Sequence, residues 1–511
     1  MSERGPLPVA DDVDIAILWL RRDLRLADNP AFAAAAAHSA VIPVFIWDDE
    51  DEAPWSPGAA SRWWLHQSLD ALQVDLLARG SRLLLRRGRA ASVLPALLDE
   101  TGARHVYWNR CYEPGAIARD TSIKQQLRAK GINVQSHNSA LLIEPWQLAT
   151  QQGKPFQVFT PFWRAALSQL PPPGRATPAP VPRAPPKWPA SVTLDSLGLM
   201  PARDWYKSLA QHWQPGEAGA QQRLREFVTD GAADYARQRE FPSLPGSSRL
   251  SPHLHFGEIS PQQIWHALRS TADSRGLGPA HWRDSRFVTE LGWREFAHHL
   301  LYHFPHTTSQ PLRASFANFP WRSDEAALAA WRRGETGIPL VDAGMRELWA
   351  TGWMHNRVRM VVASFLVKNL RLDWLCGARW FWDTLVDADL ANNTLGWQWV
   401  AGCGADAAPY FRIFNPLSQA QKFDPGGDYV RRWVPQLGPG GKATDYPAPI
   451  VDLRVSRLDA LAAYRDMRER SAGGLPTAAA TATTTTARRS AAAAAGTRAR
   501  RTRRGRNRTG Q

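Results

Sequence analysis

The sequence predicts an N-terminal α/β domain with a parallel sheet, joined by a long linker to an all-α domain. Short apolar runs alternate with helical stretches over the first 140 residues, and a proline-rich stretch follows. Beyond residue 215 the periodicity is helical almost throughout. With 511 residues, the chain is also too long for one ordinary hydrophobic core, so at least two folded units are expected.

The first predicted domain covers residues 13–140. Strands are predicted at 15–20, 40–47, 82–85 and 105–108, and helices at 30–38, 59–79 and 91–101. This alternation is typical of a parallel sheet covered by helices on both faces. No G-x-G-x-x-G follows the first strand, so a dinucleotide cradle is not predicted there. The charged run at 21–25 is interpreted, on its charge alone, as a solvated loop.

The rest of the chain divides into three parts. Residues 141–214 are predicted to be a linker, because nine of the nineteen positions from 171 to 189 are proline, which favours an extended chain. Residues 215–468 are predicted to form the helical domain. Residues 475–511 are rich in alanine, threonine and arginine, and they are predicted to be a disordered basic tail.

Charge indicates the class of partner. The formal net charge is +15, and nine arginines without any acid lie in the tail, so the rest of the chain is moderately basic. A basic excess favours polyanions but carries no sequence specificity. No apolar run is long enough to span a bilayer, and the N-terminus lacks the pattern of a secretory signal. A cytoplasmic protein without a membrane partner is therefore expected.

Cysteine usage excludes several kinds of site. Cys111, Cys376 and Cys403 lie far apart in the sequence. Their spacing matches neither a disulfide framework nor a zinc ligand set, and three thiolates are too few for the usual four-cysteine iron–sulfur cluster. No metal site is predicted.

Two helical segments combine polar and aromatic side chains on one face. Glu290 and Trp293 are three residues apart and share a face, although this segment alone fits an ordinary amphipathic helix. Asn356, Arg359 and Met360 share a face of a later helix. A buried arginine there needs an acid as its partner, and the pair Asp387 and Asp389 can supply one.

A third segment, residues 387–399, holds two acids, two asparagines and two tryptophans. Such a stretch is too polar to bury unless a ligand satisfies it. It therefore predicts a binding site.

These segments together resemble the DNA photolyase/cryptochrome family. The motifs WLRRDLRLADNPAF, GSSRLSPHLHFGEISP, GWREF, TGIPLVDAGMREL, TGWMHNRVRM, DADLANN, GWQW and ADAAPYFRIFNP occur in family order, over about residues 13–440. The resemblance implies an antenna-binding α/β domain and a helical domain that binds FAD in a bent conformation. FAD binding in the helical domain agrees with the absence of a G-x-G-x-x-G motif after the first strand.

The resemblance also implies which residues contact FAD. A run from Ser247 to Ser251 would hold the diphosphate with backbone N–H groups and hydroxyls. Arg359 and Asp387 would pair against the flavin ring with Asp389 nearby, and Asn393 would face N5, where an asparagine favours the reduced, anionic flavin. The implied FAD contacts are Tyr235, Ser247, Ser248, Arg249, Leu250, Ser251, Phe287, Glu290, Arg294, Asn356, Arg359, Asp387, Asp389 and Asn393.

Three tryptophans match the electron-transfer positions of the family. Trp397 would lie nearest the flavin, followed by Trp374 and then by Trp321 at the surface. Each of the outer two is also compatible with a plain core position. Asn393 and Glu290 complete the residues that we assign to catalysis.

The residues at two pocket positions of the family indicate which type of DNA lesion the protein repairs. Neither Asn356 nor Met360 is histidine, so the general-acid chemistry used on (6-4) photoproducts is missing and a cyclobutane pyrimidine dimer is expected. The lesion must leave the duplex to reach a buried flavin. The implied DNA and lesion contacts are Arg239, Glu290, Trp293, Arg294, Asn356, Arg357, Met360 and Trp399.

The implied activity is that of a carbon–carbon lyase: light-driven repair of the dimer by electron transfer from excited reduced FAD. The expected partner is UV-damaged DNA. The protein is expected to act as a monomer in the bacterial cytosol. A cryptochrome-like photoreceptor and a light-independent DNA-binding flavoprotein are the alternatives. The run after Asn393 resembles the class III branch of the family, which is near plant cryptochromes. Plant cryptochromes, however, carry aspartate at the position of Asn393 and tyrosine at that of Trp399.

Glu113 matches an acid that contacts the antenna chromophore in folate-binding members of the family. The resemblance therefore favours methenyltetrahydrofolate over a deazaflavin as the antenna. The alternative is that Glu113 is an ordinary surface acid.

Overall fold

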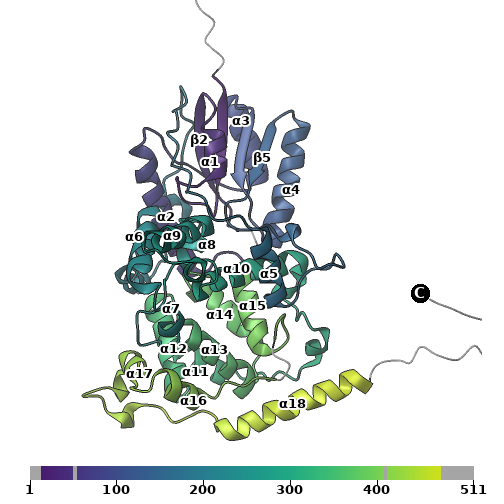
Figure 1. Ribbon diagram of the computed structural model, residues 1–511, viewed down its shortest axis with the longest axis vertical. Helices are drawn as coiled ribbons and strands as arrows, with labels where there is room; N and C mark the ends of the chain where they lie inside the picture. Colours follow the sequence, from purple (N-terminus) through teal and green to yellow (C-terminus); the bar gives the residue numbers. More distant parts are fainter. Residues whose placement is uncertain (1–12, 50–53, 408–410, 474–511) are drawn as a thin grey trace, which may run out of the picture.

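The computed structural model describes residues 13–49, 54–407 and 411–473, so the predicted tail at 475–511 lies outside the described residues. A parallel-sheet domain occupies the upper part of the molecule in Figure 1, and a helical domain lies below it. This arrangement confirms the predicted fold class.

The sheet has five parallel strands in the order β3-β2-β1-β4-β5. The strands are β1 (Ile15–Leu20), β2 (Ala40–Trp47), β3 (Leu84–Arg87), β4 (His105–Asn109) and β5 (Asn133–His137). The chain adds β2 and β3 on one side of β1, and β4 and β5 on the other. The topological switch point of the sheet therefore lies between β1 and β4.

Helices cover both faces of the sheet. They are α1 (Pro30–Ala35) and α2 (Ala59–Leu77) on one face, and α3 (Ala90–Thr101) and α4 (Pro114–Ala129) on the other. The hydrophobic cluster on the α2 side continues into the helical domain through Trp353 and Val386. The two domains consequently share part of one core.

Three strands differ from the prediction, of which β4 only ends one residue later than expected. β3 starts two residues later than expected, and β5 was not predicted. Only Val134 of β5 is buried, because the strand lies at the sheet edge and carries polar side chains. An edge strand of this kind lacks the apolar run that marks an interior strand.

The interpretation of residues 21–25 as a solvated loop is wrong. Arg21 and Arg25 are buried, at 8% and 1% exposure. Arg21 pairs with Asp120 at 2.5 Å, and Arg25 donates to the carbonyl oxygen of Gly257 at 2.9 Å. These partners are far away in sequence, so the local charge pattern could not indicate them.

The remaining helices are α5 (Phe159–Gln169), α6 (Glu217–Glu226), α7 (Tyr235–Gln238), α8 (Ser251–His255), α9 (Pro261–Ser274), α10 (Arg286–His303), α11 (Glu325–Arg333), α12 (Pro339–Thr351), α13 (Asn356–Ser364), α14 (Trp374–Thr384), α15 (Leu390–Ala401), α16 (Pro416–Phe423), α17 (Asp428–Trp433) and α18 (Leu453–Gly473). Helix α5 lies in the segment predicted as linker, and it packs on α10. At this contact the indole of Trp163 covers Gly292, where a Cβ would lie 2.6 Å from the ring. Across the described ranges, no helix is both long and apolar enough to cross a membrane.

Candidate active site

Helices α10, α13, α14 and α15 bring the three predicted segments together. Helix α15 packs against each of the other three, and these helices lie at the centre of the helical domain in Figure 1. Asp389 caps the N-terminus of α15 by accepting a hydrogen bond from the backbone N–H of Asn392 at 2.8 Å. The helix ends at Gly402, which has a left-handed backbone conformation.

Arg359 and Asp387 form the predicted ion pair. The Arg359 Nη2 atom lies 2.9 and 3.1 Å from the two carboxylate oxygens of Asp387. Ser251 donates a hydrogen bond to the same carboxylate at 2.7 Å, and the Nε atom of Arg359 donates to the Met354 carbonyl at 2.7 Å. The Asp387 side chain is only 4% exposed. The pair therefore joins α13, the segment before α15 and the start of α8.

Arg249 is a half-buried cation that has no partner anion among the described residues. Its guanidinium lies over the indole rings of Trp353 and Trp213, at 4.9 and 5.4 Å from the ring centroids. Burial lowers its pKa although Glu347 opposes the shift. Within the described part of the chain, the guanidinium makes no hydrogen bond or ion pair. An anionic ligand such as a diphosphate would satisfy this charge, so the residue fits the FAD site that the resemblance implies.

The rest of the implied diphosphate run lies beside α7. Ser247 and Ser248 are half-buried, and Ser248 Oγ accepts a hydrogen bond from the backbone N–H of Leu250 at 3.4 Å. Tyr235 on α7 is buried edge-on against Phe287 at 5.1 Å, and burial raises its pKa to about 12. Tyr235 and Phe287 thus share one aromatic cluster, as expected if both line one cavity.

Asn393 is fixed by a contact to the neighbouring helix. Its Nδ2 atom donates to the carbonyl oxygen of Ala378 on α14 at 3.0 Å. This leaves the amide oxygen of the half-buried side chain as an acceptor.

The three tryptophans of the expected electron-transfer series share one core, and the expected outermost one is the most exposed. Trp397 and Trp374 are each 3% exposed, whereas Trp321 is half-buried. The Trp397 ring lies on Gly377, one turn beyond Trp374 on α14. Trp321 is held close to α14, because the neighbouring Arg322 donates its backbone N–H to the Arg371 carbonyl at 2.7 Å.

Four charged residues form a chain that links α10 to α13. Glu290 pairs with Arg239, Arg239 lies 3.8 Å from Glu240, and Glu240 pairs with Arg357. Asn356 is exposed and Met360 half-buried on the same stretch of α13. The structure thus brings most of the expected lesion contacts to one region.

Two expected lesion contacts are aromatic. Trp293 stacks on Phe159 with ring centroids 3.9 Å apart and an interplanar angle of 7°. Trp399 is half-buried, and its Nε1 donates to the Asp406 carbonyl at 3.1 Å. Both indoles are therefore held in place by other parts of the protein.

Arg294 and Asp389 do not join these groups. Arg294 donates to the Ala140 carbonyl at 2.7 Å, and the Asp389 carboxylate lies 3.5 Å from His298. Both residues line a separate pocket at the domain boundary, and Glu113 lines the same pocket. Their expected contacts with FAD or the lesion stay predictions.

The polarity of residues 387–399 is largely satisfied without a ligand, so this part of the sequence argument is wrong. Asp387 pairs with Arg359, and Asp389 caps α15. Gln398 donates to the carbonyl oxygens of Thr307 and Gln310 at 2.7 and 2.8 Å. Asn392, which donates to Asp389, is a local partner, whereas the partners of Asp387 and Gln398 lie in distant segments. The sequence anticipated only the Arg359–Asp387 pair.

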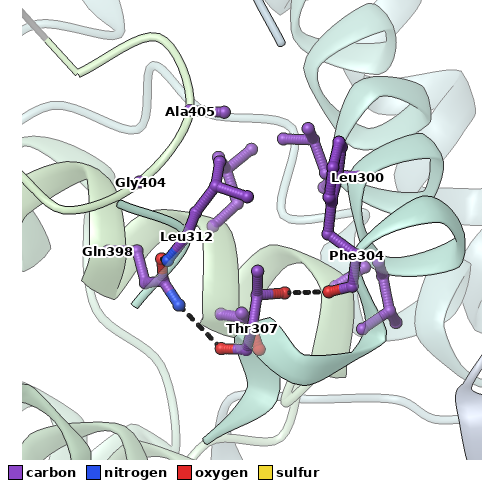
Figure 2. A pocket seen from close by; sticks show the side chains of 12 residues that line it. Leu300, Phe304, Thr307, Leu312, Gln398, Gly404 and Ala405 are labelled. Carbon is purple, nitrogen blue, oxygen red and sulfur yellow. Dashed lines mark hydrogen bonds between the residues drawn. The ribbon is translucent and has the colours of Figure 1, made fainter. Parts of the chain in front are cut away.

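Figure 2 shows the small apolar pocket that Gln398 borders, between α10 and α15. The dashed lines mark the Gln398–Thr307 bond and a bond from Thr307 Oγ to the Phe304 carbonyl, at 2.7 Å each. Gln398 also accepts the Leu312 N–H at 2.9 Å. Sequence reasoning assigned this residue no role, although it lies in the GWQW motif. The contacts indicate that it fixes α15 to the segment after α10.

The pocket at the domain boundary is the main feature that sequence reasoning missed. It lies at the carboxyl ends of β1 and β4, and its lining residues are Arg22, Asp23, Asn109, Arg110, Cys111, Tyr112, Glu113, Ser139, Ala140, Leu254, His255, Arg294, His298 and Asp389. Ligands of open parallel sheets bind at this kind of switch point. The order of the strands would have revealed the site, but the sequence alone did not establish that order.

Comparisons with known proteins agree with this geometry. A model described as the FAD binding domain of DNA photolyase matches residues 287–443, and a DNA photolyase model matches residues 16–185. The chain is 47% identical to a deoxyribodipyrimidine photo-lyase of Agrobacterium fabrum, covering 89% of this chain and 98% of that protein. It is 42% identical to cryptochrome-2 of Arabidopsis thaliana, covering 82% and 70%. A class III photolyase structure from Agrobacterium tumefaciens matches with a TM-score of 0.85 and 45% identity, covering 91% of this chain and all of that one.

Proposed function

This chain belongs to the DNA photolyase/cryptochrome family, and from that premise we propose how its residues carry out light-driven repair of cyclobutane pyrimidine dimers in UV-damaged DNA. FAD bound in the helical domain supplies the light-excited electron donor. The half-buried Arg249 would neutralise the diphosphate, and the Arg359–Asp387 pair would orient the ring system. Asn393 donates its Nδ2 to Ala378, so its amide oxygen would be the group that accepts a hydrogen bond from the flavin N5–H.

The ion-pair chain from Glu290 through Arg239 and Glu240 to Arg357 is the observation that carries this proposal. It gathers two acids and two arginines from three separate segments beside Asn356 and Met360. Arginines in such a chain can bind DNA phosphates. Contacts of this kind position the duplex without reading its sequence. Glu290 then becomes available to the flipped lesion when phosphates replace it as the partner of Arg239.

Repair is favoured over photoreception by two residues. Asn393 and Trp399 stand where plant cryptochromes carry aspartate and tyrosine, and Trp399 supplies an indole face on which a flipped base can stack. The protein acts as a monomer in the bacterial cytosol, and its basic charge supports association with DNA.

Replacing Glu290 by alanine should weaken binding of dimer-containing DNA without weakening binding of undamaged DNA. A hydrogen bond to a charged group contributes about 1.5–3 kcal/mol, so the affinity for the lesion should fall roughly 10–100-fold. Arg239 loses its nearer acidic partner in this variant and keeps only Glu240, which favours binding of phosphates in any sequence. Fluorescence anisotropy with damaged and undamaged duplexes of one sequence measures both affinities.

Glu240→Ala is the matched control, because it removes the same charge from the same ion-pair chain but leaves Glu290 in place. It should preserve the preference for damaged DNA. If both variants lose that preference equally, Glu290 acts only as a partner of Arg239 and does not contact the lesion.

The pocket at the domain boundary is the proposed antenna site, with methenyltetrahydrofolate as its chromophore. Glu113 is 7% exposed and pairs with Arg22, while its Oε2 atom is buried without a hydrogen-bond partner. Burial raises the pKa of Glu113, but Arg22, His298 and a backbone hydrogen bond together outweigh this effect and the net shift is downward. An ionised carboxylate with an unused oxygen suits the N–H donors along the edge of a pterin ring.

Glu113→Gln should therefore remove the folate absorption band from the purified protein and leave the flavin bands unchanged. An amide can accept only one of the two hydrogen bonds that the carboxylate offers, and it loses the charge. Repair under light absorbed by FAD itself should persist. Absorption spectra of both proteins test this, and a deazaflavin spectrum in the parent protein would contradict the folate assignment.

A further inference from the structure

Three metal-ligating side chains converge at the amino-terminal edge of the sheet, the edge opposite the pocket at the domain boundary. Asp14 immediately precedes β1, His38 precedes β2, and His105 is the first residue of β4. Because β1 lies between β2 and β4, the Asp14 carboxylate can contact both imidazoles.

The candidate ligand atoms of the three side chains lie close together. His38 Nδ1 lies 2.7 Å from Asp14 Oδ2, and His105 Nε2 lies 3.1 Å from Asp14 Oδ1. The two imidazole rings are 4.2 Å apart between centroids. All the candidate ligand atoms are within 4.8 Å of one another. A single ion could therefore reach all three groups after small side-chain adjustments.

Each imidazole is also held from its other side. His38 Nε2 is 2.7 Å from the Tyr107 hydroxyl, and His105 Nδ1 is 3.2 Å from the Asn133 side-chain amide. Metal-binding histidines have such partners on the second ring nitrogen, which fix the ring orientation.

We propose that Asp14, His38 and His105 bind a divalent transition metal ion, for which Zn²⁺ is the test ion. Two imidazoles and one carboxylate are a known three-ligand set for zinc, and water takes the fourth position. The Asp14 side chain is 50% exposed, so water can reach the site. Imidazole ligands favour zinc, copper and nickel over magnesium and calcium. The ion would connect three adjacent strands and stabilise the α/β domain.

The test is a calorimetric titration of the flavin-loaded full chain with ZnCl₂ at neutral pH, after dialysis against a chelator. His105→Gln should lower the zinc affinity roughly 10-fold or more, since even a lost supporting hydrogen bond costs 10–100-fold. Zinc should also raise the Tm of the parent protein but not that of the variant. The control is His66→Gln, because His66 lies 3.3 Å from Asp195 in a simple pair and should not affect zinc binding.

Asp14→Asn supplies a second variant if His105→Gln fails to fold, because the Asp14 side chain is half exposed and the change is isosteric. Equal zinc affinity in the parent protein and Asp14→Asn would overturn the proposal and leave a hydrogen-bonded network only. Equal affinity for Mg²⁺ and Zn²⁺ would also overturn it. Light-driven repair should be the same in all these variants, so a failure here is distinct from a failure of the repair function.

Discussion

Replacing Trp397 by phenylalanine is expected to slow the reduction of the bound flavin by light and to preserve repair by enzyme that has been reduced chemically. Phenylalanine keeps the edge-on packing against Phe381, at 5.0 Å in the parent protein, so the fold should persist. Its ring lacks the accessible radical of an indole, and the path to Trp374 and the surface is interrupted. We expect photoreduction to slow at least about tenfold, a barrier increase of about 1.4 kcal/mol.

Trp331→Phe is the control for this variant. Trp331 is fully buried and packs edge-on against Trp397 at 6.3 Å, but it lies outside the predicted series. Flavin absorbance during illumination with an external reductant measures the rate. Normal photoreduction in Trp397→Phe, or an equal loss in Trp331→Phe, would contradict the assigned electron path.

Asp387→Asn is expected to lower both the stability of the helical domain and its content of FAD. The substitution keeps the shape and the contact with Ser251, but it leaves Arg359 without a carboxylate partner. Breaking a buried ion pair by removing one partner costs about 3–5 kcal/mol, and the partial exposure of Arg359 places this pair near the lower end. Denaturant unfolding and the ratio of flavin to protein absorbance measure the two effects.

Asp428→Asn makes the same chemical change in an exposed pair, since Asp428 lies 2.6 Å from Arg431 at the surface. It should cost less than about 1 kcal/mol and leave the FAD content unchanged. If Asp387→Asn behaves like this control, the Arg359–Asp387 pair does not support the flavin site.

The sequence predicts the interior of the sheet well and its edge poorly. The observed bounds of β1 and β2 equal the predicted ones, because both strands are buried on both faces and read as continuous apolar runs. β5 escaped prediction because it buries only Val134. A local apolar pattern indicates that a strand is buried. An edge strand buries few side chains, so it lacks such a pattern.

Within the site, the Arg359–Asp387 pair was expected from the family motifs and is present. Interactions between distant segments were not predicted. The indoles of Trp213 and Trp353 around Arg249, and the backbone partners of Gln398, depend on how the helices pack. No spacing rule within one segment identifies such contacts.

The most direct test of light-driven repair uses a duplex that carries one cyclobutane thymine dimer, incubated with chemically reduced protein under blue light or in darkness. Chromatography of the digested DNA quantifies the restored thymines. Restoration in the light alone, with more dimers repaired than protein molecules present, is the expected result. Dimers that persist under illumination, while the flavin of the same protein still undergoes photoreduction, would contradict repair as the function of this chain.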